Sequence, residues 1–258
     1  MEVLGRVGDI VGWHARSYRR QWFGSITTSF LNPVFFLLSI GVLLGTLVDE
    51  SDPDLGGLTY VEFVAPALIA ATAMQTAASA TTFPVKIGLK WYRTYHAVVA
   101  TPVRVAELVV GVLAWAGVRI LVAASVFAFV AAVGGAFLSP LAVLAPLAAL
   151  LCGLAFAAGL AAISAGTDND QWLVAIFRFA LLPLFLFSGT FFPVEQLPDW
   201  IEPLAWATPL WHGVELTRDL ATGDVPAVPT AVHVAYLTLL TVVGTVIAVR
   251  ACEGKLLK

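Results

Sequence analysis

Long apolar runs separated by short polar segments dominate the chain. Six runs are long enough to cross the hydrocarbon core of a bilayer, which takes about 20 helical residues. They cover residues 30–48, 61–83, 106–134, 141–165, 172–192 and 229–249. The alternating pattern of a membrane-spanning β-barrel is absent. Because backbone polar groups in lipid must bond within the protein, the pattern predicts an all-α integral membrane protein. Six transmembrane helices would form one domain over residues 1–258.

The amino-acid composition excludes several classes of protein. Hydrophobic residues make up 59% of the chain and charged residues 12%, whereas a soluble domain carries about 25% charge. So little polar surface excludes a soluble enzyme, a disordered chain and a nucleic-acid binder. The net charge of −3 also argues against a polyanionic partner. Membrane lipid is the expected surrounding, and no nucleic acid is expected among the partners.

Basic residues predict the orientation of the spans, since Lys and Arg concentrate on the cytoplasmic side. In a six-span arrangement most of the Lys and Arg residues fall on one side. They are Arg6, Arg16, Arg19, Arg20, Lys86, Lys90, Arg93, Arg104, Arg250, Lys255 and Lys258. The opposite side carries acidic groups in the segments that follow spans one and five. Both termini are therefore expected in the cytoplasm.

Two cytoplasmic segments are more than connectors. Residues 1–29 mix arginines with aromatic residues and predict an interfacial amphipathic helix rather than a signal peptide. Residues 84–105 form a basic, aromatic segment that could contact lipid or dock onto a protein. The candidate docking residues are Lys86, Lys90, Trp91, Tyr92, Arg93, Tyr95 and His96. The residues alone leave the two roles of this segment open.

Polar side chains also occur inside the predicted spans. Thr72, Gln75, Thr76, Ser79 and Thr82 share one helical face, which indicates either helix packing or the lining of a transport pathway. Arg119 lies deep in the third span, where a charge is costly and often functional. It could line the same pathway or pair with Glu62. By the same reasoning, Arg178 could pair with Glu107.

Catalytic motifs are absent from the sequence. It contains no phosphate-binding loop of the G-x-x-x-x-G-K-[ST] type, no H-E-x-x-H and no C-x-x-C. The four histidines show no ligand spacing. Asp168–Asn169–Asp170 resembles half of a calcium loop but lacks the remaining ligands, so we interpret it as a polar turn. No catalytic residue, metal site or bound cofactor is expected in this chain.

Residues 188–218 carry the most specific pattern. A serine–glycine pair and Phe-Pro precede two Leu-Pro or Pro-Leu steps and a closing E-x-x-R. The matching residues are Ser188, Gly189, Phe192, Pro193, Leu197, Pro198, Pro209, Leu210, Glu215 and Arg218. Together with Ala100–Val103 and Asn32–Pro33, this pattern resembles type-2 ABC exporter permeases. The resemblance is nearest to permeases for nodulation lipo-oligosaccharides and then to daunorubicin-resistance permeases.

The resemblance implies a homodimeric permease driven by two copies of a separate cytoplasmic ATP-binding cassette subunit, which binds the ATP and Mg. It also implies a coupling helix within residues 84–98 and an outer re-entrant helical hairpin within residues 193–228. Such a permease would sit in a bacterial cytoplasmic membrane and export an amphiphile: a glycolipid, a lipid-linked saccharide or a hydrophobic drug. Two alternatives remain, namely an integral-membrane enzyme acting on lipid head groups and a passive channel.

Overall fold

The computed structural model describes residues 2–18, 34–35, 39, 55 and 57–257. The predicted first span, residues 30–48, therefore lies almost entirely outside the described residues. So do Asn32, Pro33 and the aromatic end of the predicted interfacial segment, including Trp22. Every regular element in the described part of the chain is a helix, which confirms the predicted all-α class.

The described helices follow the apolar runs closely. Their bounds are α1 Glu2–Tyr18, α4 Tyr60–Lys86, η2 Ile87–Trp91, α5 Thr94–Val99, α6 Val105–Val133, η3 Pro140–Leu144, α7 Ala145–Gly166, α8 Asp170–Ile176, η4 Phe177–Leu181, α9 Leu182–Phe187, η5 Val194–Gln196, α10 Glu202–Trp206, α11 Pro209–Thr222 and α12 Ala227–Leu256. Within the described residues, 5 continuous helical stretches are long and apolar enough to cross a membrane. They coincide with the predicted spans two to six.

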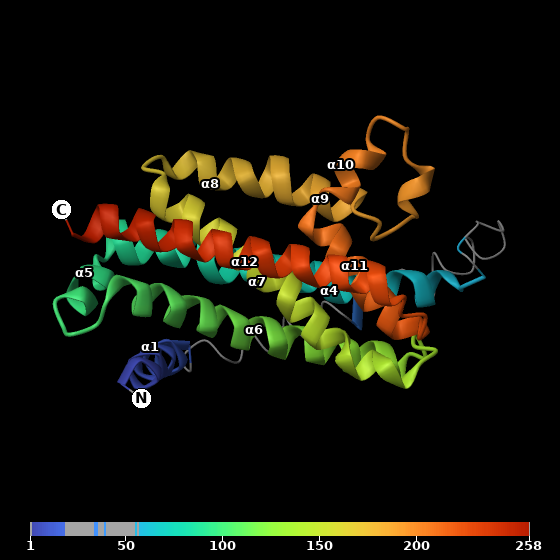
Figure 1. The fold of residues 1–258 in the computed structure, drawn as a ribbon, viewed down its shortest axis with the longest axis horizontal. Helices are drawn as coiled ribbons and strands as arrows, with labels where there is room; N and C mark the ends of the chain where they lie inside the picture. The colour runs from blue at the N-terminus through green and yellow to red at the C-terminus, as the bar shows by residue number, and fades with distance from the viewer. Residues whose placement is uncertain (1, 19–33, 36–38, 40–54, 56, 258) are drawn as a thin grey trace.

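Helix α7 lies at the centre of the bundle, between α4 and α12 (Figure 1). Small residues that recur every four positions along α7 allow this close packing. They are Gly153, Ala157, Ala161 and Ala165. A Cβ atom added at Gly153 would lie 2.8 Å from the Ile120 side chain and 3.2 Å from the Ala73 carbonyl oxygen. One added at Gly244 of α12 would lie 2.9 Å from the backbone of α7. Neighbouring helices thus approach α7 to backbone contact, as small residues permit in lipid.

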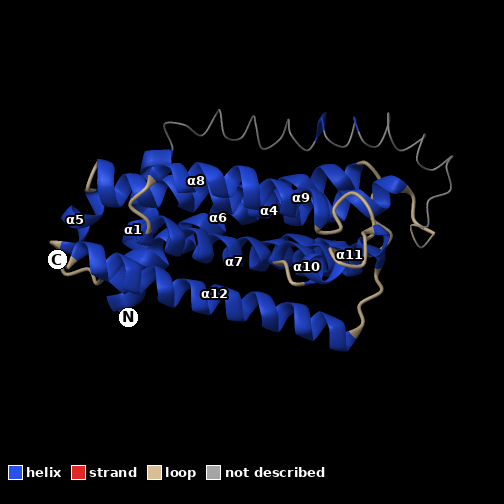
Figure 2. Ribbon diagram, turned by 90° about the horizontal axis from the view of Figure 1, so that it is seen from above, coloured by secondary structure: helices blue, strands red, loops and turns tan. Residues whose placement is uncertain are grey.

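The two termini lie at the same end of the bundle, beside α5, whereas α10 lies at the opposite end (Figure 1). Helix α1 crosses this end at a steep angle to the long helices, as Figures 1 and 2 show from perpendicular directions. Ile10 of α1 packs onto Gly111 of α6, where an added Cβ atom would lie 2.7 Å from the isoleucine. The Tyr18 ring meets the Trp115 ring edge-on at 5.6 Å. A crosswise helix with an apolar face suits the membrane interface.

The second span extends further than hydropathy predicts. Helix α4 contains Lys86 and continues through the π-helical turn η2 to Trp91, so residues 84–91 are not a separate connector. Only the short helix α5 and its flanking turns leave the bundle axis. Lys86 remains helical and buried because acceptors from the α7–α8 turn meet its ammonium group.

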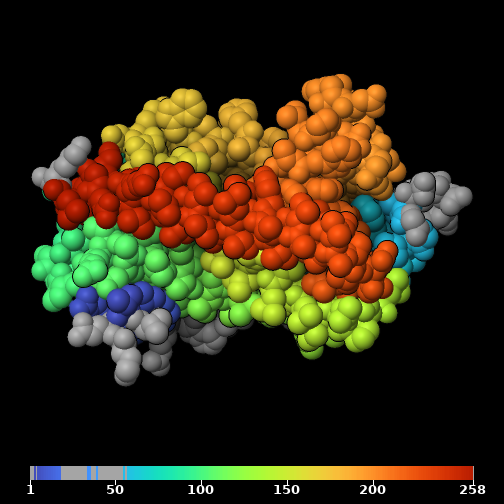
Figure 3. All heavy atoms as spheres, in the orientation of Figure 1, coloured from blue at the N-terminus to red at the C-terminus, as the bar shows by residue number. Residues whose placement is uncertain are grey.

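After α9 the chain breaks into the short elements η5, α10 and α11. Proline begins two of these breaks: Pro193 precedes η5 and Pro209 is the first residue of α11. Helix α11 packs against α4, α7 and α12, while η5 and α10 protrude at the upper right of the space-filling view (Figure 3). The turn before η3 is fastened to α11, because Leu138 and Ser139 both donate to the Ala221 carbonyl, each at 3.0 Å.

Candidate functional site

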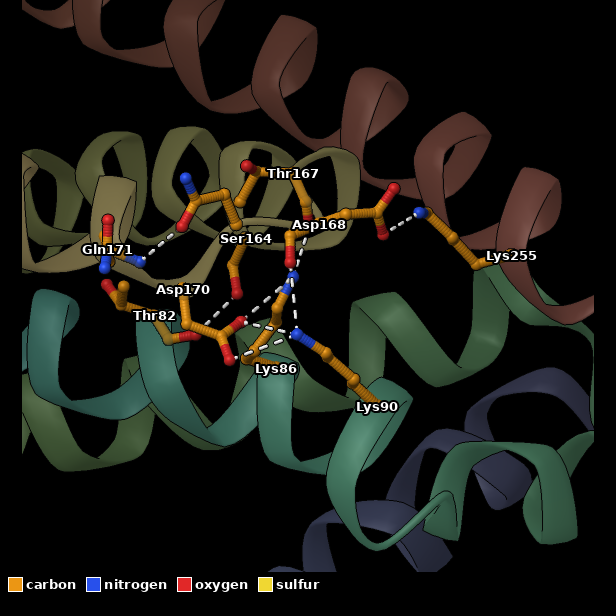
Figure 4. A network of polar contacts seen from close by, with 10 residues as sticks. Thr82, Lys86, Lys90, Ser164, Thr167, Asp168, Asp170, Gln171 and Lys255 are labelled. Carbon is orange, nitrogen blue, oxygen red and sulfur yellow. Dashed lines mark hydrogen bonds and ion pairs between the residues drawn. The ribbon is translucent and has the colours of Figure 1, made fainter.

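Three segments distant in sequence meet at the end that carries both termini. Lys86 and Lys90 come from the α4–η2 helix, Asp168 and Asp170 from the α7–α8 turn, and Lys255 from the end of α12 (Figure 4). We call these five residues the ionic junction. Asp170 is shared, since its carboxylate lies 3.1 Å from the Lys90 ammonium group and 3.7 Å from that of Lys86. Lys255 pairs with Asp168.

Backbone groups complete the junction. Lys86 donates to the Thr167 carbonyl, and Lys90 donates to the Asp168 carbonyl at 3.1 Å. Asn169 caps α8 by accepting a bond of 2.9 Å from the Gln171 amide. Asp170 follows in the first turn of α8, where a negative charge favours the helix dipole. The chain therefore turns sharply at Asn169, and the carboxylates of Asp168 and Asp170 on either side of it meet the lysines.

Exposure differs strongly among the partners. The Lys86 side chain is 4% exposed and that of Asp168 is 84% exposed. The hydrogen bond and charge of Lys255 hold the pKa of Asp168 below its usual range, so this carboxylate stays ionised at neutral pH. Deeper in the bundle, the Ser164 hydroxyl donates to the Thr82 carbonyl at 2.6 Å and fastens α7 to α4. The junction thus couples one buried cation to a solvated turn.

The predicted docking residues divide into exposed and buried groups. Trp91 and Tyr92 are 52% and 77% exposed, and Arg93 beside them has a left-handed backbone with φ of +52°. Tyr95, in contrast, is only 3% exposed. A Cβ atom at Gly88 would lie 2.6 Å from the Tyr95 ring, so this ring packs under η2. The expectation that Tyr95 presents its ring to a partner is wrong, because α5 folds back onto the helix end.

The predicted polar face of α4 meets Arg119. The guanidinium group of Arg119 lies 3.5 Å from the Ser79 hydroxyl and 5.3 Å from the centre of the Tyr18 ring. Gln75 and Ser79 are exposed in the single chain, and Thr72 and Thr76 are half-buried. Thr82, by contrast, is fully buried. Arg119 therefore connects the part of the polar face around Ser79 to Tyr18 of α1.

Two sequence-based pairings are corrected. Glu62 accepts a hydrogen bond of 2.8 Å from the Thr59 amide and caps α4 at its far end, so it is not the partner of Arg119. Glu107 accepts bonds from the Arg104 amide at 2.8 Å and from Arg6 at 3.3 Å, rather than pairing with Arg178. Both carboxylates stand in the first turn of a helix, where each accepts a hydrogen bond from the amide that begins the helix.

At the opposite end of the bundle, Arg218 contacts other residues of the 188–218 motif. It donates to Glu215 at 2.6 Å and to the Gly189 carbonyl at 2.7 Å, and its guanidinium lies 4.0 Å from the centre of the Phe63 ring. Gly189 has φ of +76°, which a glycine adopts without strain. Burial lowers the pKa of Arg218, and burial also raises the pKa of Glu215. One side chain thus links α11 to α4 and to the end of α9.

The remaining motif residues support this end of the chain. The Ser188 hydroxyl lies 3.0 Å from that of Thr208, and Thr208 accepts a bond from the Trp211 amide at 3.2 Å that caps α11. Phe192 packs against a small apolar cluster that contains Val194. The Pro198 carbonyl accepts a bond of 2.8 Å from the amide three residues later. The motif therefore shapes the turns between α9 and α11.

A histidine pair joins α11 to α12, although the spacing of the four histidines along the chain does not predict it. The Nδ1 atoms of His212 in α11 and His233 in α12 lie 2.6 Å apart, and both side chains are buried. Tyr236 stacks on His212 at 4.0 Å between ring centres. The aromatic residues close to these histidines in the sequence, Trp211 and Tyr236, were the available sign that the histidines pack in a buried contact. Within the described residues, no group of three or more His, Cys, Asp or Glu side chains could hold a metal ion.

Comparison with known proteins identifies the family. Residues 11–221 match the family described as ABC-2 type transporter. The chain belongs to this family. It is 30% identical to Nodulation protein J of Sinorhizobium fredii over 93% of this chain and 90% of that protein. Identity to Nodulation protein J of Rhizobium leguminosarum bv. trifolii is 28% over 98% and 96% of the two chains.

A shorter match extends the range of relatives. The chain is 32% identical over 66 residues, 26% of its length, to Probable multidrug ABC transporter permease YbhR of Escherichia coli, of which the match covers 18%. The ABC-2 type chain is thus the multi-pass membrane subunit of an ABC transporter and not itself an enzyme. The family match confirms the predicted class of type-2 ABC permeases. Permeases of this family generally pair with ATP-binding cassette subunits, which is the kind of partner that the sequence predicts.

Proposed function

We propose that this chain is the permease of an exporter that moves an amphiphilic substrate out across a bacterial cytoplasmic membrane. The proposed substrate class is a glycolipid, a lipid-linked saccharide or a hydrophobic drug. The drug alternative agrees with the name of one relative, the probable multidrug ABC transporter permease. Two copies of the chain and two copies of the ATP-binding subunit form the transporter, and ATP and Mg bind the latter. Six spans with cytoplasmic termini, an interfacial α1 and a re-entrant α10–α11 hairpin complete the architecture.

The ionic junction is the observation that best supports a role of residues 84–105 in transmitting movement from the ATP-binding subunit to the membrane helices. A segment that receives mechanical work from an ATPase must be fastened to several spans, or its movement would be lost in loop flexibility. Residues 84–105 meet this requirement: Lys86 and Lys90 bind the turn between α7 and α8, and that turn binds Lys255 at the end of α12. Exposed Trp91 and Tyr92 stand beside the junction and can enter a groove on the partner.

The polar face of α4 and Arg119 supply a candidate pathway. Gln75 and Ser79 are exposed in the single chain, and Arg119 adds a positive charge next to Ser79. Since a polar stripe in lipid requires another helix or water, it suits the interface between two permease copies. An anionic group on the substrate would be attracted to Arg119. In this arrangement the substrate passes between the two copies of the permease.

Purification of the chain with and without its ATP-binding subunit tests the proposal. The sequence has no phosphate-binding loop, so the chain alone should not hydrolyse ATP, and the complex should hydrolyse ATP and transport the amphiphile. ATP-independent flux of a solute through the chain alone would favour the passive channel. Modification of lipid head groups by the chain alone would favour the membrane enzyme, and either result would overturn the exporter.

A further inference from the structure

A cavity of about 350 Å³ opens beside the ionic junction. Its lining contains four cationic side chains, Lys86, Lys90, Arg93 and Lys255, together with Asp168. Asp170 binds the first two lysines. Four positive charges therefore face two carboxylates, and the cavity retains a net positive charge. Because the site is concave and partly desolvated, this excess raises the local concentration of anions.

Two groups at the cavity have no partner among the described residues. The Nδ1 atom of His96 is buried and makes no hydrogen bond, although a buried polar atom is normally satisfied. Arg93 lines the same cavity, has a left-handed backbone, and its side chain makes no hydrogen bond or ion pair with the described residues. The lysines are held by the two aspartates, so Arg93 is the cation left to bind something else, and His96 lines the cavity beside it.

We propose that this cavity binds a phosphate group, with Arg93 and His96 as its principal donors. A guanidinium fork matches phosphate oxygens, and an imidazole N–H can donate a further bond. Leu89 and Ala165 add apolar side chains to the lining of the cavity. Basic pockets at the ends of membrane helices bind the head groups of anionic lipids. The surroundings thus suit the phosphate of a lipid head group, while soluble phosphate shares the same chemistry.

The full-length chain, purified in detergent and stripped of lipid, provides the test. Phosphatidylglycerol or phosphatidylcholine is added, and bound lipid is counted by native mass spectrometry. The wild-type chain should retain phosphatidylglycerol in preference. The double variant Arg93→Asn and His96→Gln should bind it about tenfold more weakly, as expected for a lost bond to a charged group. Asn keeps the left-handed backbone accessible.

A matched control removes the same charge elsewhere. Arg250→Gln lies on α12 at the same end of the bundle but outside the cavity lining, so its lipid binding should equal that of the wild type. A parallel arm measures the melting temperature with inorganic phosphate. Stabilisation of the wild type but not of the double variant by inorganic phosphate, without a lipid preference, would assign the site to soluble phosphate. If the double variant and Arg250→Gln behave alike in both arms, the proposal is overturned.

Discussion

The two ends of the bundle are fastened by opposite kinds of polar contact. At the end with both termini, the ionic junction uses long lysine side chains and a solvated turn, with Asp168 84% exposed. At the other end, Arg218 and Glu215 form a part-buried pair with side chains 13% and 28% exposed, Gly189 and Phe63 complete the surroundings of Arg218, and α11 meets α12 through a buried histidine pair. Exposed ion pairs contribute little to stability, whereas breaking a buried pair is costly.

This difference suits different tasks. The pairs made by Lys90 and Lys255 lie in water and exchange partners at small cost. These two contacts can therefore hold the coupling segment in more than one position, while buried Lys86 keeps it attached to the bundle. The contacts at the α11 end, which include a buried histidine pair and a part-buried arginine, permit few alternatives, because each displaced polar group would lose its partner. We therefore expect the α11 end to be the more rigid part of the bundle and the junction to be its more adjustable part.

The largest effect is expected from Arg218→Met. This change leaves Glu215 and the Gly189 carbonyl without their donor. Because the pair is part-buried, the cost should lie at or below the value of about 3–5 kcal/mol for breaking a fully buried pair. Thermal unfolding in detergent should show a strong decrease in stability. Arg218→Lys should recover part of it, since the charge remains but the fork is lost. Equal stability of Arg218→Met and the wild type would contradict the expectation that the α11 end is the more rigid one.

A smaller effect is expected where α11 meets α7. A Cβ atom at Gly213 would lie 2.5 Å from the sulfur of Cys152, so Gly213→Ala should cost about 1–3 kcal/mol through overpacking. Adding Cys152→Ala should restore much of the loss, because it removes the clashing sulfur. Gly159→Ala is the control, since an added Cβ atom there has no neighbour within 4 Å. If Cys152→Ala gives no recovery, overpacking is not the cause.

Asp170→Asn should affect function more than folding. It removes the ionic partner of Lys86 and Lys90, but the Thr167 and Asp168 carbonyls remain as acceptors. Melting of the purified chain should therefore change less than in Arg218→Met. Transport per ATP hydrolysed should fall in the complex with the ATP-binding subunit. Normal transport with normal folding would show that the junction transmits no movement.

The smallest effect concerns pH. Burial lowers the pKa of His212 from 6.5 to about 4. The unfolded chain therefore binds a proton below about pH 6.5 that the folded chain resists until about pH 4, and stability falls over this window. His212→Gln should flatten this loss. Asp219, whose pKa is raised to about 7 by burial, acts in the opposite direction in both proteins, so the difference reports on His212 together with its contact to His233. Identical pH profiles would contradict the assignment.

Much of the fold could be predicted from the sequence. The apolar runs located spans two to six because membrane insertion depends on local composition. Their ends were less predictable: Lys86 suggests a loop by its charge, yet remains helical because distant acceptors meet its ammonium group. Local hydropathy carries no information on such a partner.

The candidate site shows the same limit. Asp168–Asn169–Asp170 could be interpreted only as a polar turn, because the lysines that meet it lie 78 to 87 positions away in the chain. Tyr95 was grouped with Trp91 and Tyr92 by proximity in sequence, but the left-handed residue Arg93 reverses the chain and buries it. Composition and spacing identify residue types, whereas the tertiary fold decides which of them meet.

The central claim is that an ATP-binding subunit drives this permease through the exposed end of η2. Reconstituted complex carrying Trp91→Ala and Tyr92→Ala tests it most directly, by transport of the amphiphile and ATP hydrolysis in the same proteoliposomes. Loss of two aromatic anchors should cost several kcal/mol at the interface and reduce transport at least about tenfold, with normal insertion. Trp172→Ala, an aromatic residue 64% exposed on α8, should transport normally. Wild-type transport by the double variant would contradict the claim.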